Sequence, residues 1–161
     1  LADLQKQVNN TQPIQNNNIT IQVYLNTQCA NAMSLDSFVK NIQLTMDDLF
    51  MSNIDGLSSI FVKQLQKMDY TERPIHCSDP KKLNFYIKSE KEWTEDNGEI
   101  VCQAVERVKK GANGTVSEYM RSETMNDHEQ LELMKVVQTI NKKTDNTTII
   151  KLIGNSVILK T

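Results

Sequence analysis

The sequence predicts an α+β fold, in which a small antiparallel sheet packs with several amphipathic helices. Two stretches, 19–25 and 83–88, alternate apolar and polar residues as half-buried strands do. Elsewhere, as in 57–68, apolar residues recur at spacings of three and four, which is typical of helices with one buried face. The length of 161 residues corresponds to about one domain, large enough to bury a core without disulfides or metal ions.

The first eight residues, LADLQKQV, carry the pattern of a coiled-coil end. Leu1, Leu4 and Val8 fall at the a, d and a positions of one heptad, so they are interpreted as a seam that arrives from upstream. A single heptad is also compatible with a frayed amphipathic terminus, and both interpretations stay open.

Residues 9–18, NNTQPIQNNN, are predicted to be a linker. Asn and Gln bury no apolar area, and Pro13 interrupts a helix. The globular domain is therefore expected to span 19–161 as one unit, with a subdivision near 111–115 left open.

The N-terminal half of this domain is expected to contain one strand and three helices. Residues 19–25, ITIQVYL, are predicted to form the strand, because every second residue is a large aliphatic one. Ser34 is placed as the N-cap of the first helix and Thr45 as the cap of a short second helix at 46–51. The third helix, at 57–68, has the most regular apolar stripe of the chain.

The stretch 70–93 organises the rest of the chain. It contains the one tryptophan and two of the three prolines. We predict a hairpin around 75–88, in which a proline-containing turn joins a short strand to the alternating one. The chain then turns again towards Trp93, and strand 19–25 is expected to join the same sheet.

The C-terminal third is predicted to contain two helices and a second hairpin. A helix is expected at 98–110, ending at a glycine-containing loop at 111–114. An Asn-x-x-Glu capping box precedes a second helix at 127–142. Residues 147–160 are predicted to form a hairpin around a Gly-Asn turn.

The composition of the chain argues against several classes of function. The net charge of −2 argues against a domain that holds nucleic acid by charge alone. The three cysteines, Cys29, Cys77 and Cys102, have no CxxC spacing and are interpreted as reduced thiols, which argues against secretion. No apolar run approaches the roughly 18 residues that a membrane span needs, so no membrane partner is expected.

The pattern of chemically active residues predicts no catalytic, cofactor or metal site. HExxH, GxSxG, Walker and GxGxxG motifs are all missing from the sequence. His76 and Cys77 are adjacent on a predicted strand and so point to opposite faces, where they cannot pair as base and nucleophile. A small buried Cys and a His on the polar face are the favoured interpretation. The cysteines and His128 likewise lack metal-ligand spacing.

A basic hairpin with aromatic residues supplies the candidate interaction surface. Such a hairpin can lie along a phosphate backbone, although interleaved carboxylates favour an ordinary solvated surface. The candidate interaction residues are Arg73, His76, Lys81, Lys82, Tyr86, Lys88 and Trp93.

Two stretches of the chain carry a resemblance to a known family. They are NNNITIQVYLNTQCANAMSLDSFV at 16–39 and GLSSIFVKQLQKMDYTERPIHCSDPKKLNFYIKSEKEWTED at 56–96, with QKQV and the polar linker upstream. These residues resemble a C-terminal domain of unknown function in giant-virus (nucleocytoplasmic large DNA virus) proteins that also carry a zinc finger and a coiled coil. The resemblance covers roughly residues 1–110, and the zinc finger has no counterpart in it.

The resemblance implies a viral protein, in the virion or in the viral factory of the host cytoplasm, that self-associates through an upstream coil. The leading hypothesis is a non-enzymatic interaction and oligomerisation domain of a structural or virion-associated component. Its partners would be its own copies and other viral proteins, with no small-molecule substrate and no cofactor. The alternatives are an accessory domain of a viral DNA-binding protein and, third, a cysteine-dependent enzyme that uses Cys77.

Overall fold

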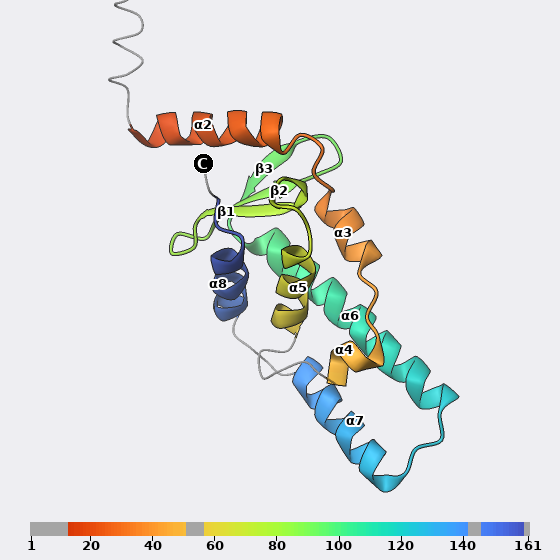
Figure 1. Cartoon of the computed structure of the whole chain (residues 1–161). Coiled ribbons are helices and arrows are strands. Elements are labelled where there is room, and N and C mark those ends of the chain that lie inside the picture. The colour runs from red at the N-terminus through yellow and green to blue at the C-terminus, as the bar shows by residue number, and fades with distance from the viewer. Residues whose placement is uncertain (1–12, 51–56, 142–145, 160–161) are drawn as a thin grey trace, which may run out of the picture.

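A computed structural model describes residues 13–50, 57–141 and 146–159 of the chain. Within these residues it contains a three-stranded antiparallel sheet and seven α-helices, which confirms the α+β prediction (Figure 1).

The sheet has the order β1-β2-β3 and is built from the central stretch of the sequence. Strand β1 spans Ile75–Asp79, β2 spans Asn84–Lys88 and β3 spans Trp93–Asp96. The predicted hairpin is confirmed, and the further turn towards Trp93 leads into a third strand. A short 3₁₀ helix, η1 at Tyr70–Glu72, precedes the sheet.

Six helices pack on one side of the sheet or extend from that side (Figure 1). They share one large core, in which Phe61, Leu65 and Phe85 are fully buried. The six are α3 (Leu35–Asn41), α4 (Met46–Phe50), α5 (Leu57–Gln66), α6 (Glu99–Ser122), α7 (Asp127–Ile140) and α8 (Asn146–Ser156).

The predicted helix caps are present. The Ser34 hydroxyl accepts a hydrogen bond of 3.1 Å from the backbone N–H of Ser37, at the start of α3. The Asn126 side chain accepts one of 2.8 Å from the N–H of Glu129, at the start of α7. Because such caps satisfy N–H groups that a helix leaves unpaired, they define where these helices begin.

The prediction of a strand at 19–25 is wrong, because these residues lie in helix α2, Pro13–Gln28. Residues 13–18 of the expected linker belong to the same helix, whereas 1–12, with the predicted seam, lie outside the described residues. The alternation has a different origin. Ile21 and Leu25, four residues apart, are buried, while Ile19 and Val23, also four apart, are exposed on the opposite face. Two helical stripes therefore interleave to imitate the period of a strand.

The expected loop at 111–114 is wrong, because α6 continues through it to Ser122. Ala112 and Val116 extend the buried stripe of this helix beyond the two glycines. Their packing outweighs the cost of roughly 1 kcal/mol that each Gly adds to a helix interior.

The C-terminal hairpin expected at 147–160 is also wrong, since its described residues, 147–159, form most of α8 and a short extended segment. After the helix, the backbone N–H of Leu159 donates to the carbonyl of Cys77 at 2.8 Å, so residues 157–159 run beside β1. Gly154 does not form a turn. A Cβ there would lie 3.3 Å from Cys77 Sγ and from Phe85 Cζ, so glycine permits the close approach of α8 to the sheet.

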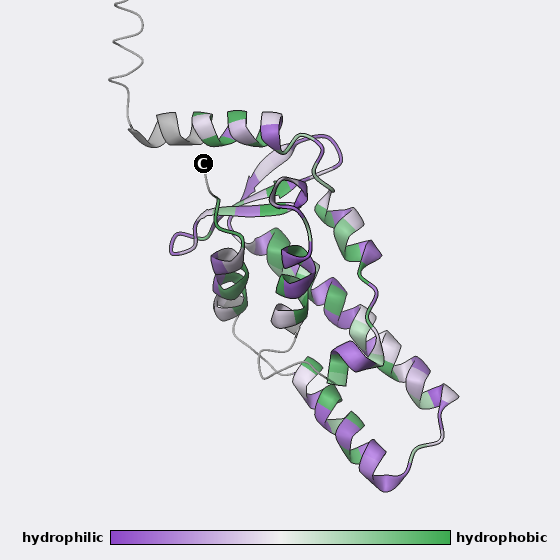
Figure 2. Cartoon of the chain, viewed as in Figure 1, coloured by the Kyte–Doolittle hydropathy of each residue, from purple (hydrophilic) through white to green (hydrophobic). Residues whose placement is uncertain are grey.

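Helix α2 covers the other face of the sheet and adds a third layer (Figure 1). Apolar residues lie on α2 as well as on the strands beneath it (Figure 2). The buried residues of this second cluster are Ile21, Leu25, Cys29, Ala32, Tyr86 and Trp93.

Candidate functional site

The sheet face under α2 carries four of the predicted interaction residues. In the register of the strands, His76 is opposite Tyr86, and Lys88 is opposite Trp93. Residues that are directly opposite point to the same face, so all four side chains share one. All four are buried, and the expectation that they form an exposed basic and aromatic surface is wrong. The missed feature is α2, which covers the face that the sequence pattern marks as polar.

His76 is enclosed by aromatic rings and by a cysteine. Its ring centroid lies 4.8 Å from that of Tyr70 and 5.6 Å from that of Trp93. Its Nε2 lies 4.0 Å from Sγ of Cys29 at the end of α2. The indole Nε1 of Trp93 donates a hydrogen bond of 3.1 Å to the carbonyl oxygen of Cys29. The cluster therefore ties the C-terminal end of α2 to the sheet.

Burial lowers the pKa of His76 to about 4, and the nearby Arg73 cation acts in the same direction. A backbone interaction with Tyr70 opposes them as the smallest of the three influences. The imidazole is therefore neutral near pH 7. Its Nδ1 is buried without a hydrogen-bond partner of good geometry, an unusual state for a polar atom. A neutral, enclosed ring of this kind is suited to packing and poorly suited to proton transfer with a substrate in solution.

The buried thiols lack the features of reactive cysteines. Burial raises the pKa of Cys77 to about 11 and also raises the pKa of Cys29. A nucleophilic cysteine needs its thiolate, which a lowered pKa and access to solvent provide. The one close sulfur–imidazole approach joins Cys29 to His76, a pair separated by 47 residues that depends on α2 being a helix. The geometry therefore gives a cysteine-dependent enzyme no support.

The other predicted interaction residues are scattered. Arg73 is half-buried, with its guanidinium carbon 5.7 Å from the centre of the Tyr70 ring. Lys81 and Lys82 are exposed in the turn between β1 and β2, where their backbone N–H groups donate to Oδ1 of Asp79 at 3.0 and 3.4 Å. Two lysines thus remain as an accessible basic pair, without the aromatic residues that were expected beside them.

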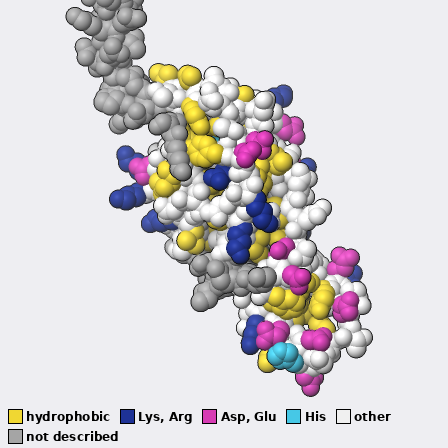
Figure 3. All heavy atoms as spheres, in the orientation of Figure 1, with side chains coloured by type: hydrophobic (Ala, Val, Ile, Leu, Met, Phe, Trp, Pro, Cys, Tyr) yellow, Lys and Arg dark blue, Asp and Glu magenta, His cyan; other side chains and the backbone are white. Residues whose placement is uncertain are grey.

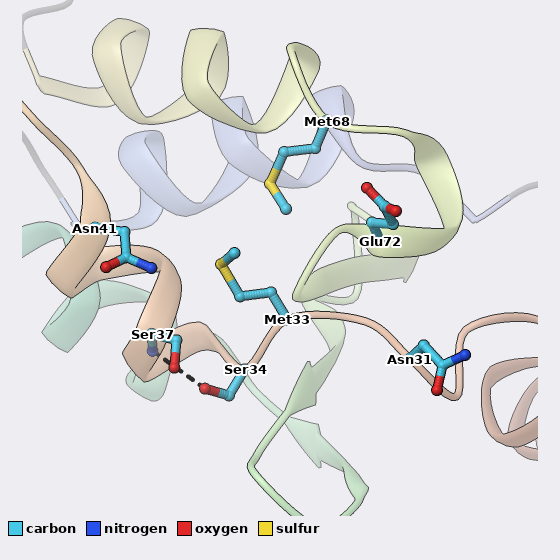
Figure 4. Close-up of a pocket in the computed structure, with 7 residues that line it drawn as sticks. All are labelled: Asn31, Met33, Ser34, Ser37, Asn41, Met68 and Glu72. Carbon is cyan, nitrogen blue, oxygen red and sulfur yellow. Dashed lines mark hydrogen bonds between the residues drawn. The ribbon is translucent and has the colours of Figure 1, made fainter.

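An open polar depression of about 510 Å³ lies between α3, the end of α5 and η1 (Figure 4). Met33 and Met68 extend into it from opposite sides. Among the described residues that line it, Glu72 alone has an ionisable side chain, so no acid–base pair is assembled there. The lining residues are Asn31, Met33, Ser34, Ser37, Asn41, Met68 and Glu72.

Metal sites, membrane spans and known protein families supply no further indication of the function of this chain. In the part of the chain that the structure describes, no three His, Cys, Asp or Glu side chains are grouped as a metal site, and no helix could span a membrane. Protein-family models, curated proteins and solved structures all fail to match the chain.

The outer face of α2 is the most distinctive exposed surface. Ile19 and Val23 are 62% and 57% exposed and lie one turn apart on the face opposite the sheet. The sequence carries no charged residue between Lys6 and Asp36, so this helix has no charged side chain at all. Solvated helix faces are normally charged, whereas depletion of charge with retained apolar residues is typical of the centre of an interface.

Proposed function

We propose that this chain is a non-enzymatic interaction domain that self-associates through the outer face of α2. The observation that carries the proposal is that α2 presents apolar residues on two opposite faces. One face packs on the sheet through Ile21 and Leu25, and the other exposes Ile19 and Val23.

A second copy of α2 is the occupant that the chemistry favours. Two uncharged helices bring no unpaired charges into their contact, which avoids the desolvation cost that a charged partner would meet there. A symmetric contact would cover Ile19 and Val23 of both copies at once. The predicted Leu1, Leu4 and Val8 seam, just upstream, would extend the same association.

The resemblance to giant-virus proteins indicates in which kind of protein this self-association would occur. It implies a structural or virion-associated component in which an upstream coil and this domain assemble together. Association driven by apolar burial should persist in high salt, because screening weakens charge contacts and leaves the hydrophobic term intact.

Light scattering in low and high salt tests the proposal. We expect the chain to form an oligomer whose mass is the same in both, and the double substitution Ile19→Gln and Val23→Gln to reduce it to a monomer. Glutamine keeps the helix propensity and the uncharged character of α2 while removing its apolar contact. A salt-sensitive oligomer that tolerates both substitutions would contradict this assignment.

An accessory role in DNA binding is the second candidate, and the exposed Lys81–Lys82 pair is the observation that favours it. Binding of a labelled duplex would then fall steeply with salt, and Lys81→Glu with Lys82→Glu would weaken it. The same charge reversals at Lys109 and Lys110, elsewhere on the surface, are the matched control. If Lys81→Glu with Lys82→Glu left the affinity for the duplex unchanged, a role of this turn in DNA binding would be excluded.

A further inference from the structure

Part of the helical layer extends away from the sheet as an arm (Figure 1). We define the arm as α4, residues 111–122 of α6, and α7. The side-chain amides of Asn113 and Asn141 exchange two hydrogen bonds, each of 3.1 Å, which join α6 to α7. The buried Leu49 of α4 packs into the same core. The arm is therefore an ordered support on which a surface can be presented.

The arm exposes an aromatic pair. Phe50, at the end of α4, is 40% exposed, and its ring packs edge-to-face on Tyr119 of α6 with centroids 6.4 Å apart. Met46 and Met125 are half-buried against the core beside these elements. Large side chains that pack on one another and still reach solvent are typical of binding surfaces, and methionine adapts to partners of different shape.

Acidic residues surround this apolar patch. Figure 3 shows hydrophobic side chains over the arm with Asp and Glu side chains around them. Residues 111–141 contain five acidic residues and two basic ones, although the whole chain has a net charge of only −2. The exposed Asp47 and Asp48 of α4 add to the excess. The acidic residues of 111–141 are Glu118, Glu123, Asp127, Glu129 and Glu132.

We propose that the Phe50–Tyr119 patch binds a basic amphipathic helix of another protein. The apolar face of such a helix would cover the aromatic pair, and its Lys and Arg residues would meet the carboxylates around it. The α2 face of a second copy does not fit, because it carries no charge to complement the acidic rim. This inference stands on the arm alone and does not depend on self-association.

The first test uses a defined probe and the full chain. A fluorescein-labelled Leu–Lys amphipathic peptide of about 14 residues, close to four helical turns, is titrated with the protein and followed by anisotropy. We expect binding that weakens with salt, and no binding of the matched Leu–Glu peptide, which keeps the apolar face and reverses the charge. Equal binding of both peptides would overturn the proposal, since it would show apolar adhesion without charge selection.

Matched substitutions then locate the site. Glu118→Lys with Glu132→Lys should raise the Kd for the Leu–Lys peptide by about tenfold or more, through loss of charge complementarity. Glu90→Lys with Glu92→Lys changes the net charge equally at an exposed turn outside the arm and should leave the Kd almost unchanged. If both double variants weakened peptide binding equally, net charge alone would explain the effect, and the assignment of the binding site to the arm would be overturned.

The apolar half of the site has its own control. Phe50→Ser should weaken peptide binding, whereas Ile100→Ser, at a residue that is also 40% exposed but lies at the other end of α6, should not. Circular dichroism of each variant verifies that it is folded. Unchanged affinity in folded Phe50→Ser would overturn the proposal, as would equal weakening of peptide binding by Ile100→Ser.

Discussion

The indole Nε1 of Trp93 donates a hydrogen bond of 3.1 Å to the carbonyl oxygen of Cys29, which joins the first residue of β3 to the end of α2. Both groups are buried, and the imidazole of His76 lies against both residues. Trp93 is the one tryptophan of the chain, so its fluorescence reports directly on whether α2 is docked on the sheet.

Trp93→Phe should destabilise the protein by about 1–3 kcal/mol, because it removes part of a packed ring and one of the two hydrogen bonds that the buried carbonyl of Cys29 accepts, the other coming from the N–H of Ala32. The free energy of unfolding is measured by urea titration with circular dichroism. Tyr119→Phe, on the arm, is the matched aromatic control and should cost clearly less. Similar losses for the two variants would mean that the hydrogen bond contributes little to docking.

Stability should depend on pH through His76. The pKa of His76 is about 4 when folded and near 6.5 when unfolded, so the unfolded chain binds more protons between these values. The contribution of neutral His76 to the free energy of unfolding is therefore complete above about pH 6.5 and is lost as the pH falls towards 4. It amounts to roughly 3 kcal/mol at most.

Urea unfolding at pH 7.5 and pH 4.5 measures this effect. His76→Gln removes the titrating group, so the variant should lose less stability than the wild type over the same interval. Carboxylates with lowered pKa values, such as Asp36 and Asp48, titrate equally in both proteins and cancel in the comparison. Identical losses in the two proteins would show that His76 is not the source of the pH dependence.

Thiol labelling of the native protein should follow burial. Cys29 and Cys77 are buried and Cys102 is half-buried, and burial raises the pKa of all three. Alkylation at neutral pH, located by mass spectrometry, should therefore modify Cys102 first and the other two only after urea is added. Rapid native labelling of Cys77 would be the signature of an activated thiolate and would restore the enzyme hypothesis.

The glycines of two helices should respond in opposite directions to alanine. At Gly111 and Gly114 a new Cβ meets nothing within 4 Å, so each Ala should stabilise α6 by about 0.5–1 kcal/mol. At Gly154 it would lie 3.3 Å from Cys77 Sγ and Phe85 Cζ and should destabilise the contact of α8 with β1. Thermal unfolding measures both effects. Stabilisation by Gly154→Ala would show that α8 does not approach the sheet this closely.

The local signals in the sequence predicted most of the helices and the sheet. Ser34, Thr45 and Asn126 are caps in the structure, because a side-chain oxygen beside unpaired N–H groups acts within one turn. The β1–β2 hairpin followed from alternation in one short stretch. These features depend on neighbours in the sequence, and for that reason sequence reasoning can find them.

The secondary-structure predictions are wrong where tertiary packing, and not the local pattern of residues, determines the conformation. Alternation at 19–25 has the period of a strand, yet Ile21 and Leu25 pack on the sheet as one stripe of a helix. Gly154 beside Asn155 is typical of a turn, but the glycine is needed for the approach of α8 to Cys77. Without α2 over the sheet, the sequence pattern places His76 on a polar face, so its contact with Cys29 cannot be predicted.

The central claim is that the outer face of α2 joins copies of this chain. Its most direct test is the solution mass, by light scattering, of the wild type and of two double variants. One is Ile19→Gln with Val23→Gln, and the control is Leu131→Gln with Met134→Gln, at exposed α7 residues of 53% and 60% exposure. Trp93 fluorescence verifies that α2 stays docked in each.

We predict a wild-type mass that is a multiple of 18.4 kDa in low and high salt, unchanged in the control and reduced to a single chain in the α2 variant. A wild-type monomer at every protein concentration, or an α2 variant that keeps the wild-type mass, would contradict the claim.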